Sequence, residues 1–405
     1  MKLRVRVSER LHLTRGMWVM LILIVLGVAS ALYRYAFGIG AISDLSNTYP
    51  WGFWISFDLY CGVALGSGAF TIVAIVEIFG LEKFKPLLRP SILTGFLGYL
   101  MVILALLVDL GQPLRIFNLI IYRNYHSVLF EVGVCVMLYT LVLAIEFAPV
   151  FLEGIKMSRL ARTIHRYVMP FVILGVVLST LHQSSLGSML LIQPEKLHPL
   201  WWTPLLPVLF FVSAVSVGLG MVILESSLSS RAFQRGLEVD LLKKLALADV
   251  YVLALYLVLK FGELAVAGEM KYLFTSGLMS VLFWAEIVVG ALIPIILFAQ
   301  RSVRESPTGL LVGAIFVVAG LMLNRFDISW FAIHRLDPMM YVPAFMGKIA
   351  YLPTPPEVAV SIGIVSAGVL AFTLAARYLP LFSEHAGPHH EATARLRQAK
   401  SPSGD

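Results

Sequence analysis

Ionisable side chains lie inside the long apolar runs of this sequence. Tyr99, Glu131, His182 and Glu225 each fall within such a run. An ionised group in the hydrocarbon of a membrane costs several kcal/mol on insertion scales, so it needs a partner or a role. A proton relay requires groups whose pKa can be moved toward neutrality by burial and by neighbours. We therefore interpret these four residues as a candidate proton-transfer series.

Each polar residue in these runs also has an ordinary structural explanation. Lys260 and Glu263 are three residues apart, so they can pair on one helix face. Asp109 and Arg115 can form an anchoring pair, and His182 can be a hydrogen-bonded core histidine. The remaining ionisable residues considered are Asp58, Glu77, His126, Glu146 and Glu286. Spacing along the chain does not show which of them face one another.

Aromatic residues gather near the ends of several apolar runs. They are Tyr49, Trp51, Phe53, Trp54, Phe57, Tyr122, Tyr125, Trp201 and Trp202. The usual explanation is an interfacial belt, in which amphipathic rings sit at the level of the lipid headgroups. A quinone headgroup would need the same materials, namely flat apolar walls and a few polar groups for its two carbonyls. Both interpretations stay open at this point.

The composition places the chain in a membrane. Of 405 residues, 59% are hydrophobic and 14% are charged, whereas a soluble domain carries about 25% charged residues. Runs of ~20 apolar residues recur, each long enough to cross about 30 Å of hydrocarbon. Such spans must be helical, because only then are their backbone polar groups satisfied. Cys61 and Cys135 lie in apolar runs as packing residues and cannot form a CxxC metal site, an iron–sulfur cluster or a disulfide framework.

We therefore predict an all-α membrane protein with ten transmembrane spans. Their predicted bounds are 17–37, 51–80, 90–110, 127–151, 168–192, 204–228, 246–266, 273–299, 308–324 and 357–379. The ninth is the shortest and ends at Asn324-Arg325. Together they form a transmembrane domain at 17–379.

Basic residues indicate the orientation. Most of the 31 lysines and arginines fall before the first span, in alternate loops and after the tenth span. Since basic loops face the cytoplasm, we expect a cytoplasmic segment 1–16 and a cytoplasmic polar tail 380–405 around an inner-membrane domain. The net charge of +7 thus reports orientation and no nucleic-acid partner. Alternatively, the basic start followed by Ala29-Ser30-Ala31 resembles a signal peptide. The tail is expected to be disordered, with metal binding by its histidines, His385, His389 and His390, as the alternative.

A weak internal repeat relates the two halves of the domain. At offsets of about 150 residues, Ser127 to Glu131 is echoed by Ser280 to Glu286, Asp109 by Lys260, Glu77 by Glu225, and Tyr49 by His198. We expect two four-helix bundles, spans 2–5 and 6–9, flanked by spans 1 and 10. Repeats with a site between them are common in membrane proteins. Chance similarity between apolar segments is the alternative.

Several of these segments together resemble the NrfD/PsrC family of quinone-reactive membrane subunits. The matching residues are Asp44 to Asn47, Tyr49 to Asp58, Arg89-Pro90, Phe96 to Tyr99, Asn118, Ser127 to Glu131, Glu146 to Pro149, His182 to Ser188, His198 to Trp201, Phe261 to Glu263, and Phe283-Trp284 with Glu286. The likeness covers about residues 33 to 380 and is greatest to the membrane subunits of periplasmic nickel–iron hydrogenases of the hydrogenase-2 type.

The resemblance implies a role in a respiratory complex. Nickel–iron hydrogenase large and small subunits would oxidise hydrogen outside the membrane, and a ferredoxin-like iron–sulfur subunit would pass the electrons on. This chain would anchor them in the lipid bilayer and reduce quinone, with menaquinone expected, without a haem, an iron–sulfur cluster or another metal of its own. Relatives are implied to couple the reaction to proton translocation.

The resemblance also assigns residues. Tyr99, Glu131, His182 and Glu225 match positions associated with proton transfer. Asp58, Arg115 and His126 are weaker candidates for the quinone pocket, together with Trp54. The loop before Ser127 is shorter than in the hydrogenase relatives, which puts the rim of that pocket in doubt.

Three alternatives stay open. Within the family, the catalytic partner can act on formate, polysulfide or nitrite instead of hydrogen. A haem b anchor would need paired membrane histidines, whereas only His182 is deep and His126 is near an edge. A secondary transporter would also have a repeat and buried charges.

Overall fold

The computed structural model describes residues 14–46, 49, 51–192, 197–332 and 351–382. Within these residues, ten helices are long and apolar enough to cross a membrane. The prediction of an all-α membrane protein with ten spans is therefore confirmed. Most of the predicted segments 1–16 and 380–405, including the three tail histidines, lie outside the described residues.

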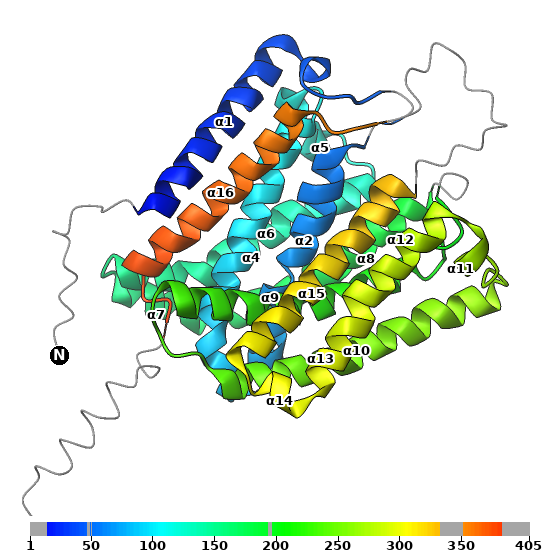
Figure 1. Ribbon diagram of the computed structural model, residues 1–405. Helices are drawn as coiled ribbons and strands as arrows, with labels where there is room; N and C mark the ends of the chain where they lie inside the picture. The colour runs from blue at the N-terminus through cyan, green and yellow to red at the C-terminus, as the bar shows by residue number, and fades with distance from the viewer. Residues whose placement is uncertain (1–13, 47–48, 50, 193–196, 333–350, 383–405) are drawn as a thin grey trace, which may run out of the picture.

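The spans run from α1 to α16 (Figure 1). They are α1 (Arg15–Phe37); Trp54–Ile78, built of η2 (Trp54–Cys61), α2 (Gly62–Leu65), α3 (Gly68–Val73) and η3 (Ala74–Ile78); Glu82–Asp109, which includes α4 (Lys85–Asp109); α6 (Val128–Gly154); α8 (Met169–Leu191); α9 (Leu206–Ala232); α10 (Val239–Val266); Leu278–Ala299, built of α12 (Leu278–Ile287), η6 (Val288–Leu292) and α13 (Ile293–Ala299); Pro307–Phe331, built of α15 (Pro307–Phe326) and η7 (Asp327–Phe331); and α16 (Pro355–Tyr378). Short helices α5 (Asn118–Ile121), α7 (Ser158–Arg166), α11 (Tyr272–Thr275) and α14 (Arg301–Arg304) lie in the connections.

The ninth span is longer than predicted. It does not end at Asn324-Arg325 but continues through a π-helical stretch to Phe331. Asn324, Arg325 and Asp327 are all buried inside the protein. The prediction was wrong because polar residues at the end of an apolar run were taken to mark the membrane surface.

The helices pack as two groups with a shared middle. We call Trp54–Ile78, α4, α6 and α8 the N-terminal bundle, and α9, α10, α12–α13 and α15 the C-terminal bundle, because these helices contact one another. The two bundles meet where α9 packs against α3 and α8. There the Ser67 hydroxyl donates a hydrogen bond to the Ala214 carbonyl oxygen at 2.6 Å.

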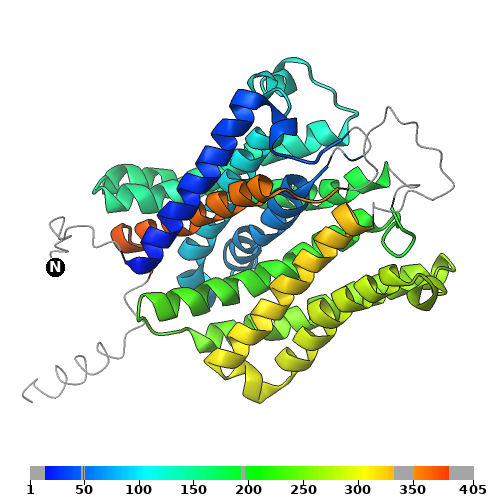
Figure 2. The same cartoon turned by 45° about the horizontal axis from the view of Figure 1, so that its top comes forward.

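The first and last spans lie side by side on one flank of the bundles (Figures 1 and 2). Gly27 of α1 meets Gly363 of α16, where a Cβ on Gly27 would lie 2.9 Å from the Gly363 Cα. Small residues at such crossings let helix backbones approach closely in a membrane. Arg15 and Tyr378 lie at the same end of the molecule (Figure 1), which we call the basic end because Lys156, Arg235 and Arg301 lie in its connections.

Candidate functional site

The N-terminal bundle holds a tyrosine–histidine pair at its core. Tyr99 on α4 and His182 on α8 are fully buried, and the Tyr99 hydroxyl oxygen lies 3.1 Å from Nδ1 of His182. Gly66 makes room for the tyrosine ring, since a Cβ there would lie 3.2 Å from its Cε2 atom. Nε2 of His182 has no hydrogen-bond partner among the described residues. Two of the four predicted proton-transfer residues are thus in direct contact.

Glu131 is linked to this pair through α8. The Ser185 hydroxyl donates to Oε1 of Glu131 at 2.6 Å, and Ser185 follows His182 by less than one helical turn. Tyr139 packs against Tyr99 with ring centroids 4.7 Å apart. The structure therefore brings Glu131, which is exposed to the surroundings of the protein, within one turn of the buried histidine.

Glu225 approaches the pair from α9, on the other side of Gly66. Oε1 of Glu225, the Ser91 hydroxyl and the Thr94 hydroxyl are buried without a hydrogen-bond partner among the described residues. All three residues line one cavity of about 10 Å³, which is roughly the space that one water molecule needs. Gly66 lines the same cavity, and a Cβ on it would meet the Tyr99 ring. One glycine thus separates Glu225 from the tyrosine–histidine pair.

Trp54 and Asp58, two of the quinone candidates, tie η2 to α16. The Trp54 indole nitrogen donates to the Glu357 carbonyl oxygen at 3.1 Å, and the Ser361 hydroxyl donates to Oδ2 of Asp58 at 2.5 Å. Both candidate side chains are buried. They therefore contact the protein itself and present little surface to a ligand in this state.

Arg115 and His126, the other two quinone candidates, are exposed in the connection between α4 and α6. No hydrogen bond or ion pair among the described residues joins them to Trp54 or Asp58, so the structure does not gather the four residues into one pocket. The alternative pair of Asp109 with Arg115 is likewise not formed among the described ion pairs.

Half-buried aromatic rings form a wall at the end of the molecule away from the basic end. Its residues are Phe53, Phe57, Phe326, Trp330 and Phe331. Ring centroids are 5.3 Å apart for Phe53 and Phe57, 6.2 Å for Phe57 and Phe326, and 4.8 Å for Trp330 and Phe331. The aromatic wall joins η2 to η7. The prediction missed its last three members because it ended the ninth span too early.

Tyr351 fixes the start of α16 beside this wall. Its hydroxyl donates to Oε1 of Glu357 at 2.7 Å and accepts a hydrogen bond from the Phe53 backbone nitrogen at 2.7 Å. Its ring stacks on Tyr49 with centroids 5.3 Å apart. Burial raises the pKa of the Tyr351 hydroxyl, so it remains a donor across the physiological range.

The C-terminal bundle contains a second buried polar network, centred on Glu286 of α12. Its carboxylate accepts hydrogen bonds from the Trp201 indole nitrogen at 2.8 Å, the Tyr256 hydroxyl at 3.1 Å and Nδ2 of Asn324 at 2.7 Å. Arg325 donates to Oδ1 of Asn324 at 2.6 Å. The sequence prediction included Glu286 among the buried charges but missed Asn324 and Arg325, which it took for the end of a span.

A glycine contact brings Glu286 and Asn324 together. Gly290 lies one turn after Glu286, and Gly320 lies one turn before Asn324. A Cβ on Gly320 would overlap the Cα of Gly290, so only glycine permits this approach of α15 to η6. The predicted pair of Lys260 with Glu263 is not among the described ion pairs; Lys260 instead lies over the Phe283 ring, 5.4 Å from its centroid.

Comparison with known proteins places these features in a family. The family model for polysulphide reductase NrfD matches residues 42–333. A protein of Nitratidesulfovibrio vulgaris is 36% identical over 90% of this chain and 93% of its own length. The probable Ni/Fe-hydrogenase 2 b-type cytochrome subunit of Escherichia coli is 32% identical over 89% and 90%, respectively. The menaquinone reductase integral membrane subunit of N. vulgaris is 32% identical over 93% and 94%. The chain therefore belongs to the NrfD/PsrC family and is a membrane subunit of that family's oxidoreductase complexes.

Proposed function

We propose that this chain is the quinone-reducing membrane subunit of a respiratory nickel–iron hydrogenase. The observation that carries the proposal is the buried Tyr99–His182 contact. Glu131 of α6 is joined to it through Ser185 of α8, and Glu225 lies across a glycine. Similarity to a hydrogenase-2 subunit and to a menaquinone reductase subunit supports both the partner and the quinone. The proposed partners are the ferredoxin-like iron–sulfur subunit and the hydrogenase large and small subunits, which would bind at the outer face of the inner membrane.

The proposed reaction balances as follows. The hydrogenase splits H₂ into two protons and two electrons outside the membrane. The electrons pass through the iron–sulfur subunit to quinone, which also takes up two protons to become quinol. If these protons come from the cytoplasmic side, each turnover stores energy across the membrane. We propose that Glu225, Tyr99, His182 and Glu131 carry them, with both termini and the basic end in the cytoplasm.

The aromatic wall supports quinone access at the extracytoplasmic end. Its rings are half-buried, so they offer flat apolar surface at the side of the bundle, as a quinone headgroup requires. The wall lies beside Trp54 and Asp58 on η2. We propose that quinone binds against this wall, and Arg115 and His126 remain proposed residues of the rim.

A haem b does not fit the described residues. The relative from E. coli is called a b-type cytochrome subunit, and haem ligation would need an axial ligand such as the free Nε2 of His182. That ring is fully buried against Tyr99, and the two cavities described occupy about 30 Å³ and 10 Å³. A porphyrin is far larger than either cavity, so we propose a role without haem.

The proposed proton path is tested by Glu225→Gln in the complete complex, reconstituted in vesicles. The amide cannot carry a proton, so the variant should assemble but lose the protons that this path delivers from the cytoplasmic side for each quinol formed. Glu82→Gln is the matched control, because Glu82 lies at the start of its span, before α4, with 76% of its side chain exposed. Proton movement at the wild-type ratio in Glu225→Gln would reject the path.

The catalytic partner is tested by isolating the chain in a mild detergent and identifying the subunits that accompany it. We expect an iron–sulfur subunit and a nickel–iron hydrogenase. A molybdenum-containing catalytic subunit acting on formate or polysulfide, or a nitrite reductase, would reject the hydrogenase assignment and retain the quinone-reactive role.

A further inference from the structure

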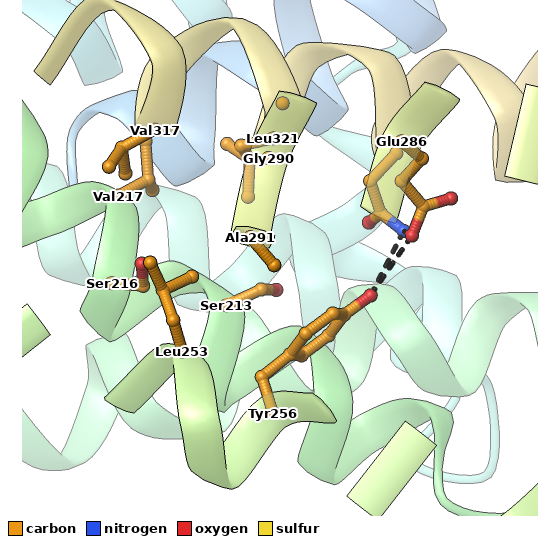
Figure 3. A pocket seen from close by; sticks show the side chains of 12 residues that line it. Ser213, Ser216, Val217, Leu253, Tyr256, Glu286, Gly290, Ala291, Val317 and Leu321 are labelled. Carbon is orange, nitrogen blue, oxygen red and sulfur yellow. Dashed lines mark hydrogen bonds between the residues drawn. The ribbon is translucent and has the colours of Figure 1, made fainter. Parts of the chain in front are cut away.

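A cavity with a mostly apolar wall and a few polar groups lies inside the C-terminal bundle. It measures about 30 Å³, and its lining includes Ser216, Leu253, Tyr256 and Glu286 (Figure 3). Ser216 and Leu253 lie toward one side, and Tyr256 and Glu286 toward the other (Figure 3). The Ser216 hydroxyl is buried without a hydrogen-bond partner among the described residues. A cavity of this size has room for water, which Ser216, Tyr256 and Glu286 in its wall could hydrogen-bond.

Asp249 lies beyond the Ser216 side of this cavity. It precedes Leu253 by about one turn of α10 and is fully buried. Neither of its carboxyl oxygens has a hydrogen-bond partner among the described residues; Ser216 lies beside the carboxyl group without meeting hydrogen-bond geometry. An unpaired carboxylate in hydrocarbon is costly. A protonated carboxyl group avoids this cost.

The network on the far side of the cavity holds compensated charge. Arg325 and Lys260 are fully buried cations, and Glu286 and Asp327 are buried carboxyl groups near them. Two cations and two acids can balance, and a buried charge is tolerable only when it is balanced. Asp249, on the other side of the cavity from Glu286, has neither a hydrogen bond nor an ion pair among the described residues.

The positions of Asp249 and Glu286 along their helices indicate how deep in the membrane the two acids lie. Asp249 lies ten residues into α10 from the basic end, which is about 15 Å at 1.5 Å per residue. Glu286 lies eight residues into α12 from the other end, which is about 12 Å on the same geometry. The two acids and the cavity between them therefore occupy the middle of a membrane about 30 Å thick.

We propose that the C-terminal bundle contains a second proton-carrying chain, which runs from Asp249 past Ser216 and through water in the cavity to Tyr256 and Glu286. The proton leaves the Asp249 carboxyl group, which takes up another from the basic end, and crosses the water to the Glu286 carboxylate that the Tyr256 hydroxyl contacts. The chain is parallel to the one through Glu225, and it rests on the proposed function in that both serve a complex that moves protons.

The test uses the complete complex in vesicles, with protons moved per quinol formed and the rate of quinol formation both measured. Asp249→Asn and Glu286→Gln remove the carboxyl protons but keep similar shapes and hydrogen-bonding oxygens. Asp240→Asn is the matched control, because Asp240 is on the same helix with 85% of its side chain exposed. We expect each test variant to lose part of the proton yield per quinol, and Asp249→Asn combined with Glu225→Gln to lose all that Glu225→Gln leaves.

The outcomes separate this chain from the path through Glu225. An unchanged proton yield in both Asp249→Asn and Glu286→Gln, with a lowered yield in Glu225→Gln, overturns the second chain and leaves the proposed function intact. A lowered yield in Asp249→Asn with no effect of Glu225→Gln supports the second chain and rejects the first path. A slower rate or lower assembly at an unchanged yield means a structural role for the cluster, and it also overturns the second chain.

Discussion

The two bundles bury their polar groups in different ways. In the N-terminal bundle, Tyr99 and His182 form a contact that can exist without any net charge. In the C-terminal bundle, the Arg325 guanidinium donates to Asn324 and lies over the Phe210 ring, 3.7 Å from its centroid. A permanent charge in a low-dielectric interior holds its neighbours strongly, because separating them exposes an uncompensated ion. The Tyr99–His182 contact is therefore suited to exchange protons, whereas the contacts of Arg325 fix helices in place.

Removing the Arg325 charge is expected to have the largest effect. Arg325→Met deletes a guanidinium that also donates to the Ser213 hydroxyl at 2.9 Å. Breaking a buried charged network costs about 3–5 kcal/mol, so the thermal unfolding temperature of the purified complex should fall strongly. Arg301→Met is the control, since 83% of the Arg301 side chain is exposed. Equal unfolding temperatures for the two variants would show that the C-terminal network does not lock the bundle.

The glycine contact beside that network should rank second. Gly320→Ala forces α15 away from η6, where a Cβ overlaps the Gly290 backbone. Overpacking of this kind costs about 1–3 kcal/mol, measured again by thermal unfolding. Gly262→Ala is the matched control, because a Cβ on Gly262 of α10 meets nothing within 4 Å. A helix position of that kind gains up to about 1 kcal/mol from alanine, so the two changes should have opposite signs.

Loss of the Tyr99 hydroxyl should have a smaller effect on stability but a clear one on turnover. Tyr99→Phe removes one hydrogen bond, worth about 0.5–1.5 kcal/mol, and interrupts the proposed path at His182. Quinone reduction and proton movement should fall, while the complex still assembles. Tyr378→Phe, at the exposed end of α16, is the control. If Tyr99→Phe destabilised the protein as much as Arg325→Met, the contrast between the bundles would be wrong.

The smallest effect on the unfolding temperature is expected for a surface ion pair. Arg301 and Glu305 are 2.9 Å apart in the connection before α15, in the exposed part of the molecule. Exposed pairs contribute about 0–1 kcal/mol, and salt screens them. Glu305→Gln should therefore leave the unfolding temperature nearly unchanged at physiological salt. A large change would mean that charges at the basic end matter as much as those buried in the bundles.

The spans were predictable from sequence because apolar length is a direct physical requirement of the bilayer. Uninterrupted apolar runs, such as those of α9 and α16, form spans close to the predicted bounds. The sequence placed Tyr99 and His182 in the same proton-transfer series, but it did not predict that they are in direct contact. The two residues are 83 positions apart in the chain, and no local pattern encodes how α4 turns toward α8.

The C-terminal network was hidden by the same reasoning that revealed the spans. From the local sequence, Asn324 and Arg325 are expected at the membrane surface. Inside the protein, however, Asn324 donates a hydrogen bond to Glu286 and Arg325 lies over the Phe210 ring. Trp330 and Phe331, which follow this polar stretch, were the sequence signal that the span goes on. The sequence did identify Glu286 as buried, because a single acid in the middle of a strongly apolar run cannot lie at the membrane surface.

The pairing of α1 with α16 has a consequence for how the protein is made. Domains assemble from the N-terminus as the ribosome releases them, but the main contact of the first helix is the last helix. Until Gly363 has been translated, the surface of α1 around Gly27 can therefore contact only lipid or an insertion factor. The nascent chain therefore stays open along this flank until α16 has been inserted.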